Sequence, residues 1–337
     1  MPKGASLNRR VLLKRGALAS AVAAVLPSAS FLAVAQSSPW PSRPIQLVHN
    51  GVAGGAVDLT ARRLADAMGP ILGTSLVVMS RPGASGLISA QAVSGAAPDG
   101  YALAYLHSGH LVLQATEGKP NILIDFTPIG LFSASQFCIG VAADSPYLNF
   151  ADLLNAIEKS PGKLNYGAGG EGSPGHIAFE KLVSLRPSLK VVQVPYKAAL
   201  ESVVALIGKQ IDFVSGVFGT VLSAHRTGRV RILAVTGPRR SSQLPDVPTV
   251  AEAAGLPGYQ HVSWGALLGP AKLPRDIVAK LFEALKSVTN DAKFQAFLTE
   301  SGGDPAQSQS PAQFGEFLKA ELTETIAMMT RLGLKKS

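Results

Sequence analysis

Short apolar runs alternate with amphipathic helical patterns along most of this 337-residue chain. The alternation predicts an α/β fold with parallel sheets, and the uninterrupted apolar runs fit sheets that helices cover on both faces. Leu64, Met68 and Ile71 have the i, i+4, i+7 spacing of a helix face, which indicates core-forming residues. The expected strands are 45–49, 76–79, 103–106, 137–142, 191–194, 211–217, 232–235 and 263–268.

Two glycine-rich segments lead from an expected strand into an expected helix: residues 47–58 (LVHNGVAGGAVD) and 164–176 (LNYGAGGEGSPGH). In the second, Ser173 is a preferred N-cap and Pro174 is preferred at the first helical position. Glycines let backbone N–H groups crowd into a loop, and a helix N-terminus adds partial positive charge. Such a loop binds a small anion without a charged side chain. One loop in each half predicts two lobes closing on one anionic ligand.

The first 35 residues are predicted to be a targeting segment. Residues 8–14 are similar to the twin-arginine export motif, and residues 33–35 (AVA) form a small-x-small cleavage site. We expect a periplasmic protein cleaved after Ala35 and exported by the twin-arginine or the general route. An uncleaved anchor is the alternative, although Pro27 leaves an apolar run shorter than the roughly 20 residues that a span needs.

Most of the apparent basicity belongs to this leader. It carries five basic residues and no acidic one, so its removal lowers the formal charge from +9 to +4. The remaining positive charge is scattered, without a Lys/Arg run interleaved with aromatic residues, and this does not favour nucleic-acid binding.

Cys138 is the only cysteine, so the chain forms no internal disulfide even in an oxidising compartment. It lies in an apolar run and is expected to be a core residue rather than a catalytic thiol. No lipobox cysteine lies near the cleavage site, so the mature protein is expected to be soluble.

Proline- and glycine-containing breaks occur at 144–146, 160–162, 244–248 and 255–258. We expect the chain to cross between lobes near 139–143 and again near 258–262. Lobe 1 would then hold residues 36–139 and 261–337, and lobe 2 residues 140–260.

Gly167, Gly169 and Gly172 satisfy the G-x-G-x-x-G pattern of dinucleotide-binding loops. That interpretation needs an acidic residue at the end of the next strand, about 20 residues later. The next expected strand ends at Val194, and the nearest acidic residue beyond it is Glu201. We therefore assign no nucleotide or other cofactor.

Ser173 is not in a nucleophile elbow, G-x-S-x-G, because Glu171 replaces the first glycine. We interpret Ser173 as an N-cap whose hydroxyl and neighbouring amides hold a carboxylate, and we assign no catalytic residue. A periplasmic hydrolase using Ser173 and His176 is the alternative.

His49, His107 and His110 lie near strand ends, where a metal site is conceivable. No H-E-x-x-H motif or tight histidine–carboxylate cluster accompanies them, so no metal is assigned. A redox or metal protein is a third hypothesis, because twin-arginine export often carries prefolded cofactor proteins; the lack of cysteine ligands speaks against it.

Three further residues are candidates for the ligand site. Asp58 is expected to N-cap a helix at 59–72 and to order the Gly54–Gly55 loop or meet a donor on the ligand. Tyr196 and Lys197 follow a strand at the edge where open α/β sheets bind ligands.

Several segments together resemble the extracytoplasmic solute receptors of tripartite tricarboxylate transporters, the Bug family. The resemblance covers essentially the whole mature chain. The segments are 42–45 (SRPI), 54–58 (GGAVD), 81–86 (RPGASG), 97–101 (APDGY), 164–167 (LNYG), 194–197 (VPYK) and 244–252 (LPDVPTVAE).

The resemblance implies a type II periplasmic binding protein fold, two α/β lobes joined by two crossings around a ligand cleft. It also implies that loop amides and bridging waters from both lobes hold one small carboxylate. The predicted ligand-binding residues are Gly54, Gly55, Ala56, Asp58, Ser108, Gly109, His110, Ala168, Gly169, Gly170, Ser173, His176, Tyr196 and Lys197.

The chain departs from the family pattern at a few of these loops. Ala53 replaces a usual proline, and Val57 and Gly216 remove polar groups. His110 and Glu171 add polar groups that could meet an amine or hydroxyl of the ligand. An aromatic, amino or amide-bearing acid is therefore as good a candidate as a simple dicarboxylate.

The resulting hypothesis is a non-enzymatic, monomeric periplasmic receptor. It would deliver a small organic acid to the membrane permease of a tripartite tricarboxylate-type transporter, or to a sensor. The sequence does not identify the ligand.

Overall fold

The computed structural model describes residues 39–196 and 199–334, and residues from Pro39 onward form one compact unit. The predicted leader, residues 1–35, and Lys197 lie outside the described residues. No helix among the described residues is both long and apolar enough to cross a membrane.

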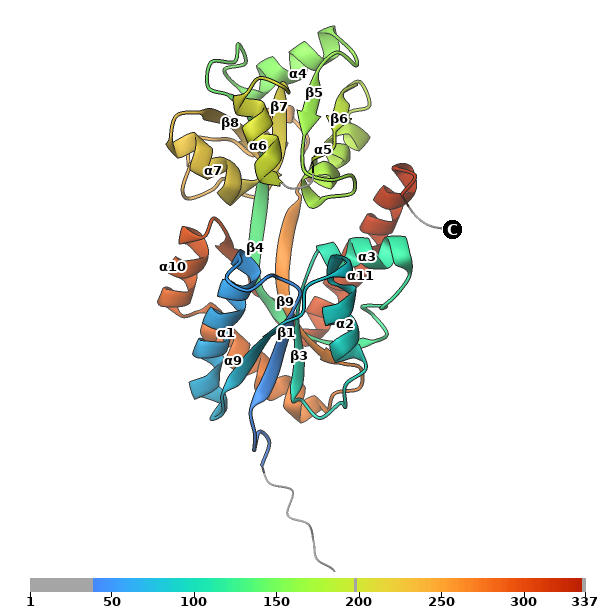
Figure 1. Cartoon of the computed structure of the whole chain (residues 1–337), viewed down its shortest axis with the longest axis vertical. Coiled ribbons are helices and arrows are strands. Elements are labelled where there is room, and N and C mark those ends of the chain that lie inside the picture. The colour runs from blue at the N-terminus through green and yellow to red at the C-terminus, as the bar shows by residue number, and fades with distance from the viewer. Residues whose placement is uncertain (1–38, 197–198, 335–337) are drawn as a thin grey trace, which may run out of the picture. The chain divides into compact units, whose positions relative to one another are not determined.

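Strands and helices alternate along the chain (Figure 1). The strands are β1 (Ile45–His49), β2 (Leu76–Ser80), β3 (Ala102–His107), β4 (Phe126–Ala142), β5 (Asn165–Gly167), β6 (Val192–Val194), β7 (Phe213–Val217), β8 (Val230–Val235), β9 (Val262–Pro270) and β10 (Asp304–Pro305). The helices are α1 (Ala56–Leu72), a 3-10 turn (Ala84–Gly86), α2 (Leu87–Ser94), α3 (Gly109–Glu117), α4 (Phe150–Lys159), α5 (Pro174–Leu185), α6 (Ala199–Ile207), α7 (Phe218–Arg226), α8 (Val250–Ala254), α9 (Arg275–Thr289), α10 (Ala292–Glu300) and α11 (Pro311–Arg331).

The first half of the fold is built on β2, β1, β3, β9 and β4, in that order. β1 pairs in parallel with β2 and β3, whereas β9 is antiparallel to β3 and β4. One apolar cluster packs α1, α9 and α10 against this sheet, and a second packs α2 and α11. Both faces are therefore covered, as continuous apolar strands require.

The second half is built on the end of β4 with β7, β5 and β6, and β8 also pairs with β4. β5, β6 and β7 are parallel to one another. At its centre Tyr166 stacks on Phe213 at a centroid distance of 5.2 Å and also contacts Phe179. α4, α5 and α8 contribute to one apolar cluster here, and α6 and α7 to another.

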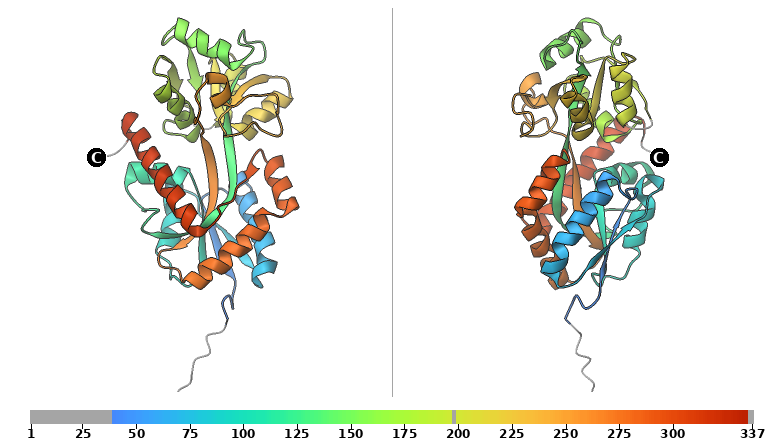
Figure 2. Two further views of the ribbon diagram at one scale, coloured as in Figure 1. Left: turned by 180° about the vertical axis from the view of Figure 1, so that it is seen from behind. Right: turned by 60° about the vertical axis from the view of Figure 1, so that its left-hand side comes forward.

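β4 and β9 connect the halves (Figures 1 and 2). β4 pairs with β9 from Phe126 to Gln136 and with β7 and β8 from Phe137 to Ala142. This change of partner supports the proposed division into two lobes, whose boundaries near residues 139 and 260 stay a prediction.

The α/β class is confirmed, and every expected strand corresponds to an observed one. The expectation of parallel sheets is correct for β1–β3 and β5–β7 and wrong for β4, β8, β9 and β10. The segment 126–136 was not expected to be a strand, because Pro128 and the polar residues Ser133, Ser135 and Gln136 break its apolar pattern.

Candidate functional site

The first glycine-rich loop connects β1 to α1. The helix begins at Ala56, after an N-cap at Gly55, so the prediction that Asp58 is the N-cap is wrong. Asp58 lies inside the first turn, and its Oδ2 accepts the N–H of Gly54 at 3.0 Å. Gly54 has φ +76°, which glycine adopts without strain. The expected ordering of the Gly54–Gly55 loop by Asp58 is therefore present.

A hydrogen-bond network occupies both oxygens of the buried Asp58 side chain. Arg62 donates through Nε to Oδ2 at 2.8 Å, and His49 Nε2 lies 3.0 Å from Oδ1. Because Gly51 N–H donates to His49 Nδ1, the ring proton lies on Nε2 and points at the carboxylate. The bonds from Arg62 and Gly54 lower the pKa of Asp58 to about 2, so it is ionised at neutral pH. This carboxylate orders the loop and has no oxygen left for a ligand.

The β3–α3 junction holds Ser108, Gly109 and His110. Ser108 is the N-cap of α3 and its Oγ lies 2.8 Å from Ser263 Oγ. Burial lowers the pKa of His107 to about 4 and that of His110 well below its usual value, so both rings are neutral. His110 is buried, and its Nε2 has no hydrogen-bond partner among the described residues.

The second glycine-rich loop connects β5 to α5. As predicted, Ser173 is the N-cap and Pro174 the first helical residue. Ser173 Oγ accepts the N–H of His176 at 3.4 Å and donates to the carbonyl of Ala168 at 3.2 Å. Tyr196 N–H donates to the carbonyl of Gly169 at 3.0 Å, which brings Tyr196 onto this loop. Gly170 lies between these contacts and is half-buried.

Ser173 and His176 do not form a nucleophile–base pair. His176 Nδ1 accepts the N–H of Gly172 at 2.9 Å, and Nε2 lies 3.8 Å from Glu180. The Ser173 hydroxyl proton points to Ala168 rather than to an imidazole. A hydrolase needs its nucleophile within hydrogen-bond reach of its base, and this arrangement lacks that contact.

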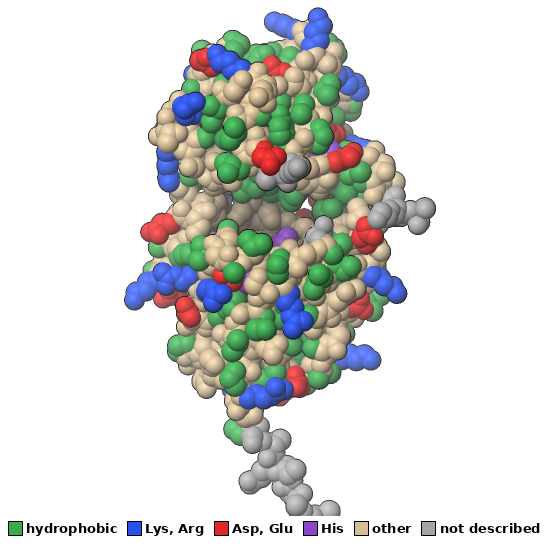
Figure 3. Space-filling view, viewed as in Figure 1, with side chains coloured by type: hydrophobic (Ala, Val, Ile, Leu, Met, Phe, Trp, Pro, Cys, Tyr) green, Lys and Arg blue, Asp and Glu red, His purple; other side chains and the backbone are tan. Residues whose placement is uncertain are grey.

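A cavity of about 280 Å³ lies where β4 and β9 meet the ends of several helices, and we call it the cleft. A hollow opens between the two halves on the face drawn in Figure 3, with hydrophobic side chains on both sides of it. The cleft is lined by Ala56, Val57, Thr60, Tyr105, His107, Ser133, Ser135, Phe137, Pro174, Val217, Ser263, Trp264, Gly265, Leu298, Ser301 and Gly303.

Three helices begin at the cleft. Ala56 and Val57 form the first turn of α1, Pro174 begins α5, and Val217 is the N-cap of α7. Each helix N-terminus carries about half a positive charge on amides without intrahelical acceptors. The lining contains no Lys, Arg, Asp or Glu among the described residues. The positive potential of the cleft therefore comes from backbone.

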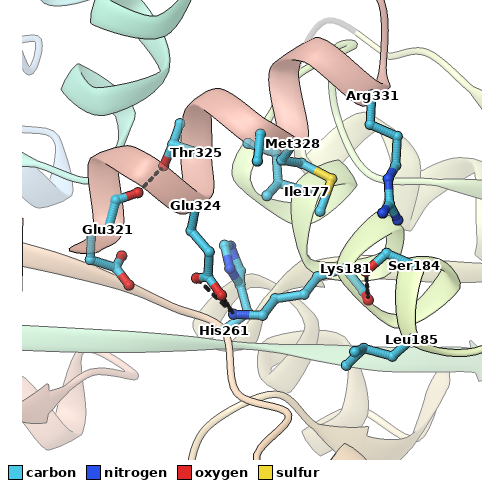
Figure 4. Close-up of a pocket in the computed structure, with 11 residues that line it drawn as sticks. Ile177, Lys181, Ser184, Leu185, His261, Glu321, Glu324, Thr325, Met328 and Arg331 are labelled. Atoms are coloured by element: carbon cyan, nitrogen blue, oxygen red, sulfur yellow. Dashed lines mark hydrogen bonds and ion pairs between the residues drawn. The ribbon is translucent and has the colours of Figure 1, made fainter. Parts of the chain in front are cut away.

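A second cavity of about 210 Å³ lies between α5 and α11, and we call it the α11 cavity (Figure 4). Lys181 of α5 and Glu324 of α11 are joined across it at 2.8 and 2.9 Å. Figure 4 also shows Arg331 pointing toward Ser184. Burial raises the pKa of Glu321, which accepts a bond from Trp264 at 3.3 Å. This cavity holds both signs of charge, so an anion entering it would meet two carboxyl groups.

Of the predicted ligand-binding residues, only Ala56 lines the cleft directly. Most of the others lie at the junctions that lead into α1, α3 and α5, Tyr196 follows β6, and Lys197 lies outside the described residues. The sequence analysis did not predict that residues of β4 and β9, including Ser133, Ser135 and Trp264, line the cleft. Recognising residues 126–136 as part of a strand would have indicated them. In residues 39–196 and 199–334 no three His, Cys, Asp or Glu side chains are grouped as a metal ion requires.

Comparison with known proteins gives a consistent result. Residues 60–334 match the family described as tripartite tricarboxylate transporter family receptor (TctC). A Cupriavidus necator protein, "UPF0065 protein in gbd 5'region", is 31% identical over 332 residues, 98% of this chain and 100% of that protein.

Solved structures agree in fold. A ligand-free TctC solute binding protein from Polaromonas has a TM-score of 0.77 and 27% identity, covering 87% of this chain and 99% of that one. The R. palustris protein Rpa4515, solved with adipate, has a TM-score of 0.72 and 28% identity, covering 87% and 98%.

Proposed function

The chain belongs to the tripartite tricarboxylate transporter receptor family, and on that premise we propose that it captures one small organic acid in the cleft. The observation that carries the proposal is the convergence of the N-termini of α1, α5 and α7 on one cavity. Helix N-termini bind carboxylates through backbone N–H groups and the helix dipole. α1 follows the first half's parallel strands, whereas α5 and α7 follow the second's, so the anion would contact both halves.

The predicted loop residues act by holding these helix ends in place. Asp58 fixes the Gly54–Gly55 turn ahead of α1, and Ser173 caps α5 beside Gly169. Preformed donors cost little ordering on binding, so a small cleft can hold an anion without a salt bridge. Ser108, Gly109 and His110 would act from the β3–α3 junction through bridging water.

Binding would favour the lobe arrangement that brings all three helix N-termini to the ligand. The shift in the equilibrium would equal the difference in the ligand's binding free energy between this arrangement and the others. β4 and β9 are the segments about which the lobes would move. We further propose that residues 1–35 direct export to the periplasm and are removed after Ala35. A monomer would then deliver its acid to a transporter permease. The R. palustris neighbour solved with adipate supports a carboxylate ligand.

Ala56→Asp tests this function. Ala56 is the first residue of α1, where an acidic side chain stabilises a helix by about 0.3–1 kcal/mol. The same side chain would place a negative charge in the cleft, repelling an anion at about 5 Å by about 3 kcal/mol at an effective dielectric constant of 20. We expect equal or higher stability and at least tenfold weaker binding of the acid that gives the largest thermal shift in a carboxylate panel.

Ala56→Asn is the matched control, because it has the same size without the charge. It should bind within threefold of the unmodified protein. Equal affinity of the Asp and Asn variants for that acid would contradict the proposed site, and chemical conversion of the bound acid would contradict the receptor assignment.

A further inference from the structure

The C-terminal end of α11 reaches from the first half of the fold to the helix that follows the second glycine-rich loop. We call residues 328–334 the α11 end. We propose that the α11 end positions the first turn of α5 and the loop before it for the ligand, and that Leu334 is the residue that holds the loop. The inference rests on the proposed function, because α5 supplies one of the three helix N-termini at the cleft.

Most of α11 is anchored in the first half. Phe314, Leu318 and Leu322 are buried in the apolar cluster that contains Trp264 of β9. A helix of 21 residues is about 30 Å long, so its last turns lie far from this anchor. Figure 2 shows α11 running from the first half of the fold to the second. The α11 end therefore connects the two halves outside β4 and β9.

The α11 end packs on the first turn of α5. Met329 is fully buried and forms one apolar cluster with Ile177 of α5 and Ala115 of α3. Ile177 is the fourth residue of α5, which begins at Pro174. Met328 packs against the same cluster and lines the α11 cavity together with Ile177 (Figure 4). This cluster holds the N-terminus of α5 against α3 and α11.

The chain turns back after α11 and brings Leu334 onto the second glycine-rich loop. Gly333 has φ +69°, and the N–H of Leu334 donates to the carbonyl of Met329 at 2.9 Å. In helix ends of this kind, a glycine in the left-handed region is followed by an apolar contact. A Cβ at Gly172 would lie 3.3 Å from Leu334 Cδ1, so the leucine side chain covers this residue of the loop.

Gly172 links the loop to the first turn of α5. Its N–H donates to His176 Nδ1 at 2.9 Å. His176 lies in that first turn, and its own N–H donates to the hydroxyl of the N-cap Ser173 at 3.4 Å. A loop that moved away at Gly172 would release His176 and disturb the cap. Leu334 therefore orders the amides that are proposed to hold the ligand, and order present before binding is not a cost to affinity.

Leu334→Ala tests the inference, because it removes the contact with Gly172 and leaves Gly333 in place. The probe is whichever of adipate, malate, hexanoate and benzoate binds the unmodified protein most tightly in calorimetric titrations at pH 7.5. We expect Leu334→Ala to bind this acid at least fivefold more weakly. Leu334→Met refills most of the space and should bind within twofold of the unmodified protein.

Leu332→Ala is the matched control. Leu332 packs against the same apolar cluster but precedes the turn that carries the chain to the loop, so this variant should bind the acid within twofold of the unmodified protein. Equal affinity of Leu334→Ala and the unmodified protein would overturn the inference, and so would equal losses in the two alanine variants. If the unmodified protein binds none of the four acids, the proposed function fails before any variant is compared, and the inference fails with it.

Hydrogen exchange of the protein without added acid provides a second test. We expect the amides within residues 169–177 to exchange at least fivefold faster in Leu334→Ala than in the unmodified protein, because the loop opens more often. Leu332→Ala should leave the exchange of these amides unchanged. Unchanged exchange in Leu334→Ala would overturn the inference and leave the proposed function standing.

Discussion

Asp58→Asn is the substitution that most sharply tests how the first loop is held. The carboxylate accepts from Gly54 and Arg62 on one oxygen and from His49 and Arg62 on the other. An asparagine has one acceptor oxygen, so one of its two positions presents an NH₂ group to a donor. If the oxygen faces Gly54, His49 must change tautomer and lose the bond from Gly51. If it faces His49, Gly54 loses its acceptor.

Either orientation leaves one backbone N–H without its partner. A buried donor without an acceptor costs about 1–3 kcal/mol, and Gly51 and Gly54 are partly or fully exposed, which places the cost at the lower end. The exposed bond to Arg62 adds less than about 1 kcal/mol. We therefore expect the free energy of unfolding to fall by about 2 kcal/mol in urea denaturation at pH 7.5.

Binding distinguishes an ordering role from a simple charge effect. Asp58→Asn removes a negative charge close to the anion site, so electrostatics alone predicts tighter binding of a carboxylate. A loosened loop predicts weaker binding, because the ligand must then order it. We expect at least fivefold weaker binding by calorimetry. Arg62→Met is the control, since it keeps the bonds from Gly54 and His49, and it should bind within twofold of the unmodified protein. Tighter binding by the asparagine variant at unchanged stability would show that Asp58 does not act by ordering the loop.

Two further predictions concern the α11 cavity and the histidines. Lys181→Met removes the ion pair with Glu324, whose carboxyl is largely exposed. We therefore expect the free energy of unfolding to fall by less than about 1 kcal/mol and the affinity for a carboxylate to stay within twofold of the unmodified protein. A tenfold loss of affinity would place the ligand in the α11 cavity. Burial lowers the pKa of His107 and of His261 from 6.5 to about 4. Between these pH values the unfolded chain binds more protons than the folded protein, so the free energy of unfolding should fall as the pH drops from 6.5 to 4. In His261→Gln, the midpoint of urea denaturation should depend less steeply on pH across this range than in the unmodified protein. An equally steep dependence would contradict a lowered pKa of His261 in the folded protein.

The first residue of a helix could be predicted from the sequence where neighbouring residues specify it, as an N-cap followed by proline does. Ser173 and Pro174 were placed correctly because an N-cap hydroxyl followed by proline specifies a helix start within a few residues. The same kind of interpretation failed at Asp58, since Gly55 acts as N-cap and the carboxylate folds back to Gly54 from the first turn. A further partner of Asp58, His49, lies on the preceding strand, where local pattern does not reveal it.

The cleft lining could not be predicted in the same way, because it depends on long-range register. Ser135 pairs opposite Ser263, and Ser133 pairs opposite Gly265, through the antiparallel contact of β4 and β9. A Cβ at Gly265 would collide with Ser133 Oγ and the Tyr105 ring, so glycine keeps this wall open. Residues so far apart in the chain meet only through sheet pairing, which the alternation of apolar runs does not specify.

The first structure to determine is a crystal structure of the protein grown with the carboxylate that binds most tightly. We expect carboxylate oxygens within hydrogen-bond distance of the first-turn amides of α1 and of α5 or α7. We also expect the rest of the ligand to pack against the cleft residues Phe137 and Trp264. A carboxylate bound instead by Lys181 or Arg331 in the α11 cavity would contradict the proposed ligand site in the cleft.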